Sequence, residues 1–261
     1  MQLEGKSALV TGGGRGIGKG IALAYAREGA DVAIVGRSRP EPEEVAAEIR
    51  ALGRQGVVIT ADLAQGSEMQ RAVREAVQSP CKVDILVNNV GGYRLYTKNL
   101  VHHLPVAELS EEEWHRVITG NLTTAFLSCK AVLPHMMERW SGVIINLTSH
   151  RLAQRGVAGQ AAYAAAKAAV ERLTESLAEE VKEYGIAANI LHPGWVLTKP
   201  NDDYDAEVHK RMRLPEDIGP AAVYLARQTP ESLTGQVVSA PEFDEEQGIQ
   251  PPSAYDRLYA S

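Results

Sequence analysis

The sequence is poor in cysteine and in aromatic side chains. Only two of its 261 residues are cysteines, Cys81 and Cys129, and Phe, Trp and Tyr together make up 5%. Two cysteines without metal-type spacing exclude a disulfide framework and favour a reducing compartment, so we expect a cytoplasmic protein. No run of about 18 apolar residues is present, which excludes a membrane-spanning helix. The first residues are charged and lead into an apolar segment, without the pattern of a signal peptide.

Basic residues are too few to suggest a nucleic-acid-binding protein. The sequence has 27 Lys and Arg against 33 Asp and Glu, a formal net charge of −6. Neutralisation of phosphates needs a basic face, so this balance argues against DNA or RNA as the partner. Metal-ligand patterns are also missing, because the adjacent pair His102 and His103 cannot present two ligands on one helical face. We therefore expect a small-molecule partner and no resident metal.

The sequence does contain a regular alternation of short apolar runs and amphipathic segments. Strands are predicted at 7–10, 31–35, 57–60, 83–87, 142–147, 187–191 and 236–239. Helices are predicted from the glycine cluster near the N-terminus to about 28, and at 42–52, 67–78, 111–137, 161–184 and 215–228. This alternation predicts an α/β fold, one doubly wound parallel sheet of about seven strands with helices on both faces. One domain is predicted over 1–240. The tail over 241–261 is expected to be a loosely held end, or else an arm packed on another subunit.

A glycine-rich turn over 11–18 follows the first predicted strand. Five of the seven residues from 12 to 18 are glycine, which lets backbone N–H groups and a helix N-terminus approach a pyrophosphate. The turn comes close to a nucleoside-triphosphate loop, but Gly20 stands where such a loop needs Ser or Thr to hold Mg²⁺. It therefore predicts a dinucleotide site.

Two arginines indicate which dinucleotide binds. The end of the second strand reads Gly-Arg-Ser-Arg over 36–39 and lacks the acidic residue that would bind the ribose 2′-hydroxyl of NAD. Arg37 can form a forked pair with a 2′-phosphate, and Arg15 can close on the same phosphate. NADP(H) is therefore predicted, with NAD(H) as the alternative if both arginines are solvated. Asp62, after the third strand, can accept from the adenine amine or act as a turn residue.

Tyr163 and Lys167 lie near the start of the predicted helix over 161–184. A spacing of four residues places both side chains on one helical face, and a nearby ammonium lowers the pKa of a phenol. Tyr163 would then serve as an acid or base near neutral pH, unlike an unperturbed tyrosine. Taken alone, this pair is common and predicts only a helix surface, so its meaning depends on the other motifs.

Together the motifs resemble those of the short-chain dehydrogenases/reductases, with the 3-oxoacyl thioester reductases as the nearest members. The matching residues follow the family's order over about 5–240, namely 11–18, Asp62, Leu63, Asn88, Asn89, Val90, Gly91, Asn121, Ser149, Tyr163, Lys167, Pro193, Gly194 and Thr198. The resemblance implies a Rossmann fold, an NAD(P) cofactor and hydride transfer to or from a carbonyl carbon. It also implies a homo-oligomer, a tetramer built on the two long helices or a dimer.

The resemblance further implies a role for each site residue. Tyr163 exchanges a proton with the substrate oxygen, Lys167 bonds the nicotinamide ribose, and Ser149 holds and polarises that oxygen. Asn121 would anchor a water in the proton relay, and we expect a local distortion there because asparagine is a poor interior helix residue. Cofactor contacts are predicted for Thr11, Gly12, Gly14, Arg15, Gly16, Ile17, Gly18, Arg37, Ser38, Asp62, Leu63, Asn89, Gly91, Tyr163, Lys167, Pro193, Gly194, Val196 and Thr198.

Departures from the family pattern bear on the substrate. Ser149 lies one residue farther from Tyr163 than is usual, so we expect one extra residue in a loop over 150–160. His150 is expected to be solvated or to line the pocket, with direct participation as the less favoured interpretation. The short polar segment over 199–213 favours an open pocket or help from a neighbouring subunit. Substrate contacts are predicted for Tyr93, Tyr96, His150, Arg151 and Trp195, which fit a partly apolar ketone or an acidic one.

The main prediction is an NADP(H)-dependent carbonyl reductase, or the reverse alcohol dehydrogenase. One alternative is an NAD-dependent alcohol or sugar dehydrogenase of the same family, and another is a non-catalytic dinucleotide-binding sensor. The presence of Asn121, Ser149, Tyr163 and Lys167 favours the enzyme, because members that lose catalysis usually lose the tyrosine or the lysine. A serine hydrolase is excluded, since the sequence around Ser149 lacks G-x-S-x-G.

Overall fold

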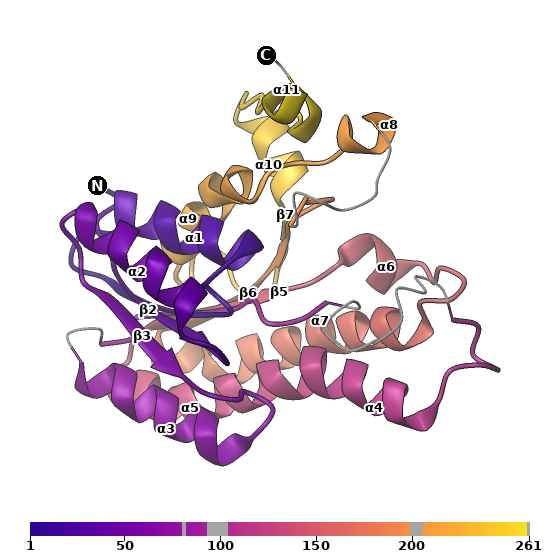
Figure 1. The fold of residues 1–261 in the computed structure, drawn as a ribbon. Helices are drawn as coiled ribbons and strands as arrows, with labels where there is room; N and C mark the ends of the chain where they lie inside the picture. The colour runs from indigo at the N-terminus through magenta and orange to yellow at the C-terminus, as the bar shows by residue number, and fades with distance from the viewer. Residues whose placement is uncertain (80–81, 93–103, 199–205, 260–261) are drawn as a thin grey trace.

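One parallel sheet runs through the molecule (Figure 1). The computed structural model describes residues 1–79, 82–92, 104–198 and 206–259. The strands are β1 (Ser7–Thr11), β2 (Asp31–Gly36), β3 (Gly56–Thr60), β4 (Ile85–Asn88), β5 (Gly142–Leu147), β6 (Ile186–His192) and β7 (Val237–Ser239). Their order in the sheet is β3-β2-β1-β4-β5-β6-β7. The predicted α/β fold with a doubly wound parallel sheet is therefore confirmed.

Helices cover both faces of this sheet (Figure 1). One face carries α1 (Gly16–Arg27), α2 (Pro40–Ala51) and α9 (Gly219–Ala226), and the other carries α3 (Gly66–Gln78), α5 (Thr124–Glu138) and α7 (Ala161–Val181). Side chains alternate along a strand, so Val10 joins the apolar cluster under α1 while its neighbour Leu9 joins the cluster under α5. Each face thus buries its own core.

The carboxyl ends of the central strands meet at one edge of the sheet. β1 lies between β2 and β4, the point at which the strand order reverses and ligands bind in such sheets. The register pairs Val10 with Val87, Asn88 with Asn146 and Leu147 with Leu191. This edge therefore gathers the ends of β1, β4, β5 and β6.

Buried amides tie α7 to the sheet just beneath that edge. Asn88 Nδ2 donates to Asn146 Oδ1 at 2.8 Å, and Asn146 Nδ2 donates to Thr174 Oγ1 at 2.8 Å. Both asparagines are buried, and Thr174 lies on α7. Buried polar groups need such partners, so this network fixes how α7 sits on β5.

The predicted helix over 111–137 is interrupted. The structure has α4 (Glu111–Ile118), a π-helical segment η1 (Thr119–Thr123) and then α5. Asn121 lies in η1, where its Nδ2 donates to Val117 O at 2.9 Å and its Oδ1 accepts from Gly92 N at 2.8 Å. The distortion expected at Asn121 is present, and it re-aims the side chain toward the loop after β4.

The segment after Ser149 is helical rather than a loop. α6 (His150–Gln154) begins directly after β5, because the Ser149 carbonyl accepts from Leu152 N at 2.8 Å and Ala153 N at 2.9 Å. The loop expected over 150–160 is thus wrong in its first half. The remaining short elements are η2 (Lys182–Tyr184), α8 (Ala206–His209) and η3 (Pro215–Ile218), the last of which begins the predicted helix over 215–228 as a 3₁₀ turn.

The C-terminal segment packs on the chain itself, so the expectation of a loosely held end is wrong. It forms α10 (Ala240–Glu246) and α11 (Ala254–Tyr259), which lie beside α8 in Figure 1. Asp244 is buried and pairs with Arg213, and Arg257 pairs with Asp217 at 2.7 Å. No helix in the described part of the chain is long and apolar enough to cross a bilayer.

Candidate active site

The glycine turn is fixed by hydrogen bonds from the end of β4. Asn89 Nδ2 donates to Thr11 O at 2.9 Å and to Gly12 O at 3.3 Å. Thr11 Oγ1 accepts from Asn89 N at 3.0 Å and donates to Val87 O at 3.2 Å. Asn89 therefore holds the turn from the neighbouring strand, a structural contact that is compatible with its predicted place beside the cofactor.

Larger side chains do not fit in the glycine turn. A Cβ atom on Gly18 would lie 2.4 Å from Gly12 O, and one on Gly14 would lie 2.8 Å from Pro42 Cδ. Gly12 and Gly16 have φ angles of +65° and +52°, which favour glycine. These glycines bring backbone from β1, α1 and α2 into close contact, as a backbone cradle for a pyrophosphate requires.

The N-terminus of α1 suits an anionic ligand. Its first turn, from Gly16, contains no acidic side chain, and among the described residues the N-cap Arg15 makes no side-chain capping bond. The first N–H groups of a helix have no partner within the helix, and the helix dipole favours negative charge there. The turn and this helix end together fit the pyrophosphate of a dinucleotide.

Residues predicted to select the dinucleotide are exposed around this turn. Arg37 follows β2 and is exposed. The guanidinium of Arg15 lies 3.9 Å from a Glu41 carboxylate oxygen, and both side chains are more than half exposed. Asp62 Oδ1 accepts from Ala64 N at 3.1 Å, which makes Asp62 a turn residue in this structure. Its contact with adenine stays a prediction.

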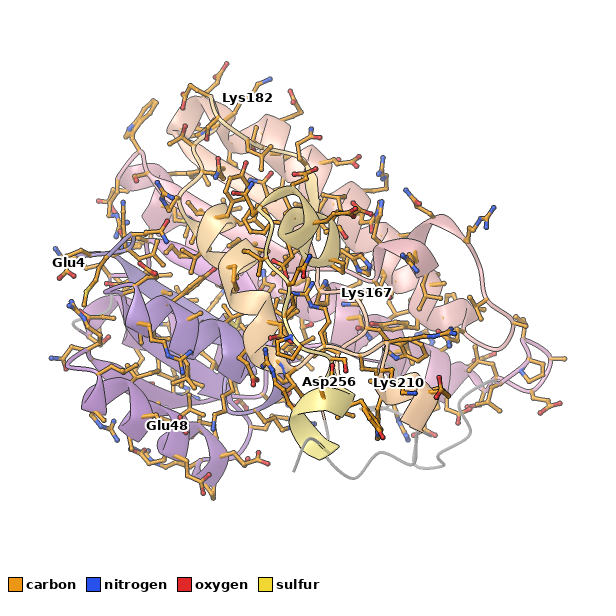
Figure 2. The ribbon with its side chains drawn as sticks, turned by 90° about the horizontal axis from the view of Figure 1, so that it is seen from above. Glu4, Glu48, Lys167, Lys182, Lys210 and Asp256 are labelled. Carbon is orange, nitrogen blue, oxygen red and sulfur yellow. The ribbon has the colours of Figure 1, made fainter. Side chains whose placement is uncertain are left out.

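Lys167 is the buried charge at the centre of the site. Figure 2 shows it inside the molecule, whereas Glu48 and Lys182 lie near the periphery. Its Nζ donates to Leu147 O at 2.9 Å and lies 5.7 Å from the centroid of the Tyr163 ring. Burial lowers the pKa of Lys167 to about 8, and the Glu171 carboxylate acts in the opposite direction. The ammonium is thus retained at neutral pH next to a phenol.

Asn121 reaches the same place through Gly91. A Cβ atom on Gly91 would lie 2.6 Å from Asn121 Oδ1 and 3.1 Å from Lys167 Nζ. The absence of a side chain at Gly91 therefore lets the π-helical segment and α7 meet at the end of β4. This close approach gives a physical reason for glycine at position 91.

Ser149 joins the group through β5. It lies two residues after Leu147, whose carbonyl accepts from Lys167, and it is half-buried at the start of α6. Asn121, Ser149, Tyr163 and Lys167 therefore come from η1, the end of β5 and α7 to one edge of the sheet. The sequence-predicted catalytic residues thus share one site in the fold, while their roles stay predictions.

The turn after β6 is supported by the C-terminal helix α10. A Cβ atom on Gly194 would lie 2.7 Å from Pro241 Cγ, so α10 packs directly against the turn after β6. Thr198 is exposed, and a Cβ atom placed on Gly16 would lie 3.3 Å from the Cβ of Thr198. The stretch after β6 therefore lies over the glycine turn, as the predicted contacts of Thr198 require.

The predicted substrate residues have different surroundings. Trp195 is 48% exposed and Arg151 is exposed, so both are open to a ligand. The His150 side chain is 27% exposed, and its Nδ1 lies 3.1 Å from the buried carboxylate of Glu171. Tyr93 and Tyr96 lie outside the described residues.

Two ionisable residues of the site were missed in the sequence. Glu171 on α7 and His192 at the end of β6 are both buried and both contact His150. Burial lowers the pKa of His192 to about 4. The available signal for Glu171 was its position four residues after Lys167, which continues the helical face of Tyr163 and Lys167.

Comparisons with known proteins identify the family of this chain. A family model described as short chain dehydrogenase matches residues 6–208. The chain is 37% identical over 245 residues to 3-oxoacyl-(acyl-carrier-protein) reductase FabG of Chlamydia pneumoniae, which covers 90% of this chain and 95% of that protein.

Two solved structures resemble the fold closely. A short chain dehydrogenase from Burkholderia cenocepacia in complex with NADP has a TM-score of 0.80 and 29% identity, over 92% of this chain and 97% of its own. A 7α-hydroxysteroid dehydrogenase complexed with NADH and 7-oxo glycochenodeoxycholic acid has a TM-score of 0.78 and 31% identity, over 91% and 93%.

Proposed function

Since the chain belongs to the short-chain dehydrogenase family, we propose that it is an NADP(H)-dependent reductase of a ketone, with Tyr163 as the general acid. Carbonyl and alcohol oxidoreduction is the chemistry of this family, and FabG of Chlamydia pneumoniae is named as a 3-oxoacyl-(acyl-carrier-protein) reductase. The same activity run in reverse oxidises a secondary alcohol. A 3-oxoacyl thioester is the first substrate to try.

When bound, a nicotinamide cofactor would supply or accept the hydride. This chain's residues do the rest: the Tyr163 hydroxyl donates its proton to the substrate oxygen, and Ser149 holds that oxygen in place. Lys167 supports the proton transfer, because its ammonium favours the phenolate that Tyr163 becomes. An ammonium has three N–H donors, and the bond to Leu147 uses one. Among the described residues that is its one hydrogen bond, so the other two donors can bind the cofactor ribose.

The preference for NADP(H) rests on Arg37. It follows the last residue of β2, where an acidic residue would repel a 2′-phosphate, and its exposed guanidinium can pair with that phosphate in a forked geometry. Arg15 is a second candidate, since an exposed ion pair such as that with Glu41 contributes little and exchanges readily. The NADP complex of the Burkholderia cenocepacia relative supports this choice.

NAD(H) dependence of the same reaction is the second candidate. The observation that favours it is Glu41, whose carboxylate is 3.9 Å from Arg15 and therefore competes with a phosphate for that guanidinium. The hydroxysteroid dehydrogenase with a similar fold was solved with NADH. A comparison of the two cofactors in one assay decides between these candidates.

The observation that carries the proposal is the burial of Lys167 beside the Tyr163 ring, at the end of β5. The test is a panel of carbonyl compounds, including a short 3-oxoacyl thioester and a cyclic ketone, with NADPH or NADH followed by absorbance. Alcohols with NADP⁺ or NAD⁺ form the reverse panel. We expect turnover with at least one ketone and faster consumption of NADPH. Tight dinucleotide binding without turnover in either direction would instead support the sensor.

A further inference from the structure

Glu171 is a buried carboxylate at the edge of the proposed site. It lies on α7, four residues after Lys167 and eight after Tyr163, and it is only 4% exposed. Burial of a carboxylate is costly unless hydrogen bonds and an opposite charge compensate it. The contacts that Glu171 makes therefore indicate what its burial achieves.

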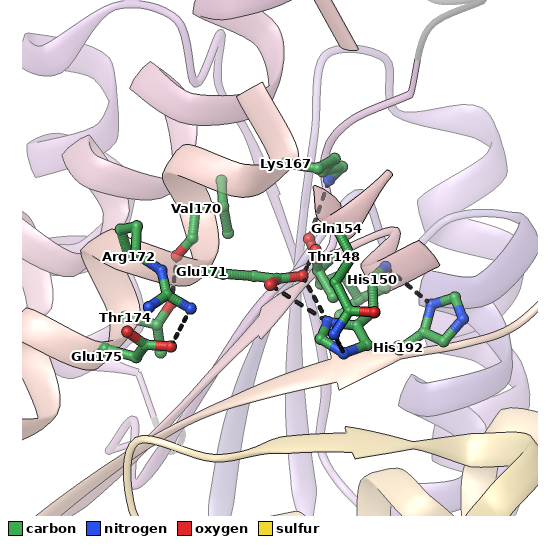
Figure 3. Close-up of polar contacts among 11 residues, drawn as sticks. Thr148, His150, Gln154, Lys167, Val170, Glu171, Arg172, Thr174, Glu175 and His192 are labelled. Carbon is green, nitrogen blue, oxygen red and sulfur yellow. Dashed lines mark hydrogen bonds and ion pairs between the residues drawn. The ribbon is translucent and has the colours of Figure 1, made fainter. Parts of the chain in front are cut away.

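Those contacts are with the two residues on either side of Ser149 (Figure 3). Glu171 Oε1 accepts from Thr148 Oγ1 at 2.7 Å. His150 Nδ1 lies 3.1 Å from Oε1 and 3.2 Å from Oε2. One carboxylate thus fixes the chain immediately before and immediately after Ser149.

His150 is held from two further directions. Its backbone N–H donates to His192 Nδ1 at 3.3 Å, which joins the start of α6 to the end of β6. Its Nε2 lies 2.8 Å from Gln154 Nε2. A carboxylate only accepts hydrogen bonds, so the contact with Glu171 calls for a proton on His150 Nδ1, and the Gln154 amide can then donate to Nε2. These contacts leave the Ser149 peptide little freedom.

The charge of Glu171 also acts on Lys167. Burial lowers the pKa of Lys167, and the negative charge of Glu171 raises it. His192, at the end of β6, also senses the charge of Glu171, together with that of His150 and Arg151 from α6 and of Glu242 from α10. Among these groups, Glu171 is the carboxylate that stands on the helix of Tyr163 and Lys167.

We propose that Glu171 is a positioning residue, which fixes Ser149 through Thr148 and His150 and stabilises the ammonium of Lys167 by its charge. This inference rests on the proposed function, because Ser149 and Lys167 are assigned there. The two contributions are separable, since one depends on hydrogen bonds and the other on charge.

Three variants separate them. Glu171→Gln keeps the shape and removes the charge. Thr148→Val keeps the charge and removes one hydrogen bond. Glu175→Gln makes the same chemical change one turn farther along α7, where Glu175 pairs with Arg172 instead (Figure 3). Glu175→Gln is therefore the matched control for a change of net charge on this helix.

The first measurement is the pH profile of kcat for carbonyl reduction. Removal of a negative neighbour favours loss of the Lys167 proton, so the alkaline limb should move to lower pH in Glu171→Gln, by about half a unit or more. kcat at the optimum should also fall, about tenfold in Glu171→Gln and about fivefold in Thr148→Val. Thr148→Val should keep the wild-type pH profile, and Glu175→Gln should keep both kcat and profile.

The second measurement needs no activity. NMR titration of the lysine side chains should find Lys167 near its pKa of about 8 in the wild type. The pKa should be lower in Glu171→Gln and unchanged in the other two variants. Circular dichroism checks that each variant is folded, and Glu171→Asp provides a charged variant that should restore the titration if Glu171→Gln unfolds.

The outcomes distinguish failure of the proposed function from failure of the inference about Glu171. If the wild type is inactive but the pKa of Lys167 still changes in Glu171→Gln, the proposed function is contradicted, whereas the electrostatic part of the inference is supported. An active wild type whose pH profile, kcat and Lys167 titration are all unchanged in Glu171→Gln would overturn the inference and leave the function intact.

Discussion

The Lys167 ammonium lies 5.7 Å from the centroid of the Tyr163 ring and donates a hydrogen bond to Leu147 O at 2.9 Å. The bond anchors Lys167 to the end of β5, two residues before Ser149. The lysine is therefore held between the strand that carries the serine and the helix that carries the tyrosine. This geometry places a positive charge beside the phenol that we propose as the proton donor, and such a charge favours the phenolate.

The glycine turn should not tolerate a methyl group at position 18. We expect Gly18→Ala to weaken NADPH binding roughly 10- to 100-fold, because the Cβ atom would lie 2.4 Å from Gly12 O and displace the N–H groups that face the pyrophosphate. Fluorescence titration with NADPH measures this. Gly156→Ala is the control, since a Cβ atom there meets nothing within 4 Å. Equal affinities for the two variants would contradict the proposed position of the pyrophosphate.

Arg37 should select the cofactor. Loss of one charge-assisted contact with a phosphate amounts to about 1.5–3 kcal/mol, so Arg37→Asp should weaken NADPH binding roughly 10- to 100-fold and leave NADH binding nearly unchanged. Arg39→Asp makes the same change of charge at a residue that pairs with Glu43. It controls for the electrostatic effect of the changed net charge near the site. An unaltered NADPH affinity in Arg37→Asp would show that this arginine does not bind the phosphate.

His192 should make the protein sensitive to acid. Burial lowers its pKa from 6.5 to about 4, so the unfolded chain binds a proton that the folded chain excludes between these values. Stability is therefore lost as pH falls from about 6.5 toward 4, by roughly 2–3 kcal/mol. His192→Asn keeps an acceptor for His150 N and should remove this loss in urea unfolding. The exposed His115→Asn is the control, and identical pH dependence in all three proteins would refute the assignment.

The pair of Arg213 and Asp244 should hold the C-terminal helices in place. Asp244 is buried and the Arg213 side chain is only 12% exposed, so Asp244→Ala leaves a largely buried charge without its carboxylate partner and should lower the free energy of unfolding by about 3 kcal/mol. Glu207→Ala removes an exposed partner of Lys210 and should not change the melting temperature measurably. A wild-type melting temperature in Asp244→Ala would mean that α10 is not anchored by this pair.

The sheet could be predicted because its signal is local. Buried parallel strands such as β5 and β6 are mainly apolar runs, each interrupted by one asparagine, and the glycine turn marks the first passage from strand to helix. A local distortion of the helix at Asn121 could be expected, because the asparagine side chain competes for backbone hydrogen-bond partners within a helix. The bond of its side chain with Gly92 N joins residues 29 apart in sequence, which no local pattern indicates.

The elements that sequence reasoning missed depend on contacts between distant residues. Glu171 becomes part of the site only when α7 packs across β5 and meets His150. Likewise, α11 is ordered by the pairing of Arg257 with Asp217, about 40 residues away. Local periodicity in the sequence does not indicate such pairs. The prediction of a loop over 150–160 and that of a loosely held tail over 241–261 were therefore the least accurate.

The central claim is that Tyr163 supplies the proton for hydride transfer. The most direct measurement is the turnover of Tyr163→Phe with NADPH and the best ketone of the panel, alongside NADPH binding to the same variant. A lost general acid is expected to lower kcat about 10²- to 10⁴-fold, and the dissociation constant for NADPH should stay close to that of the wild type. Equal turnover in Tyr163→Phe and wild type would contradict the account.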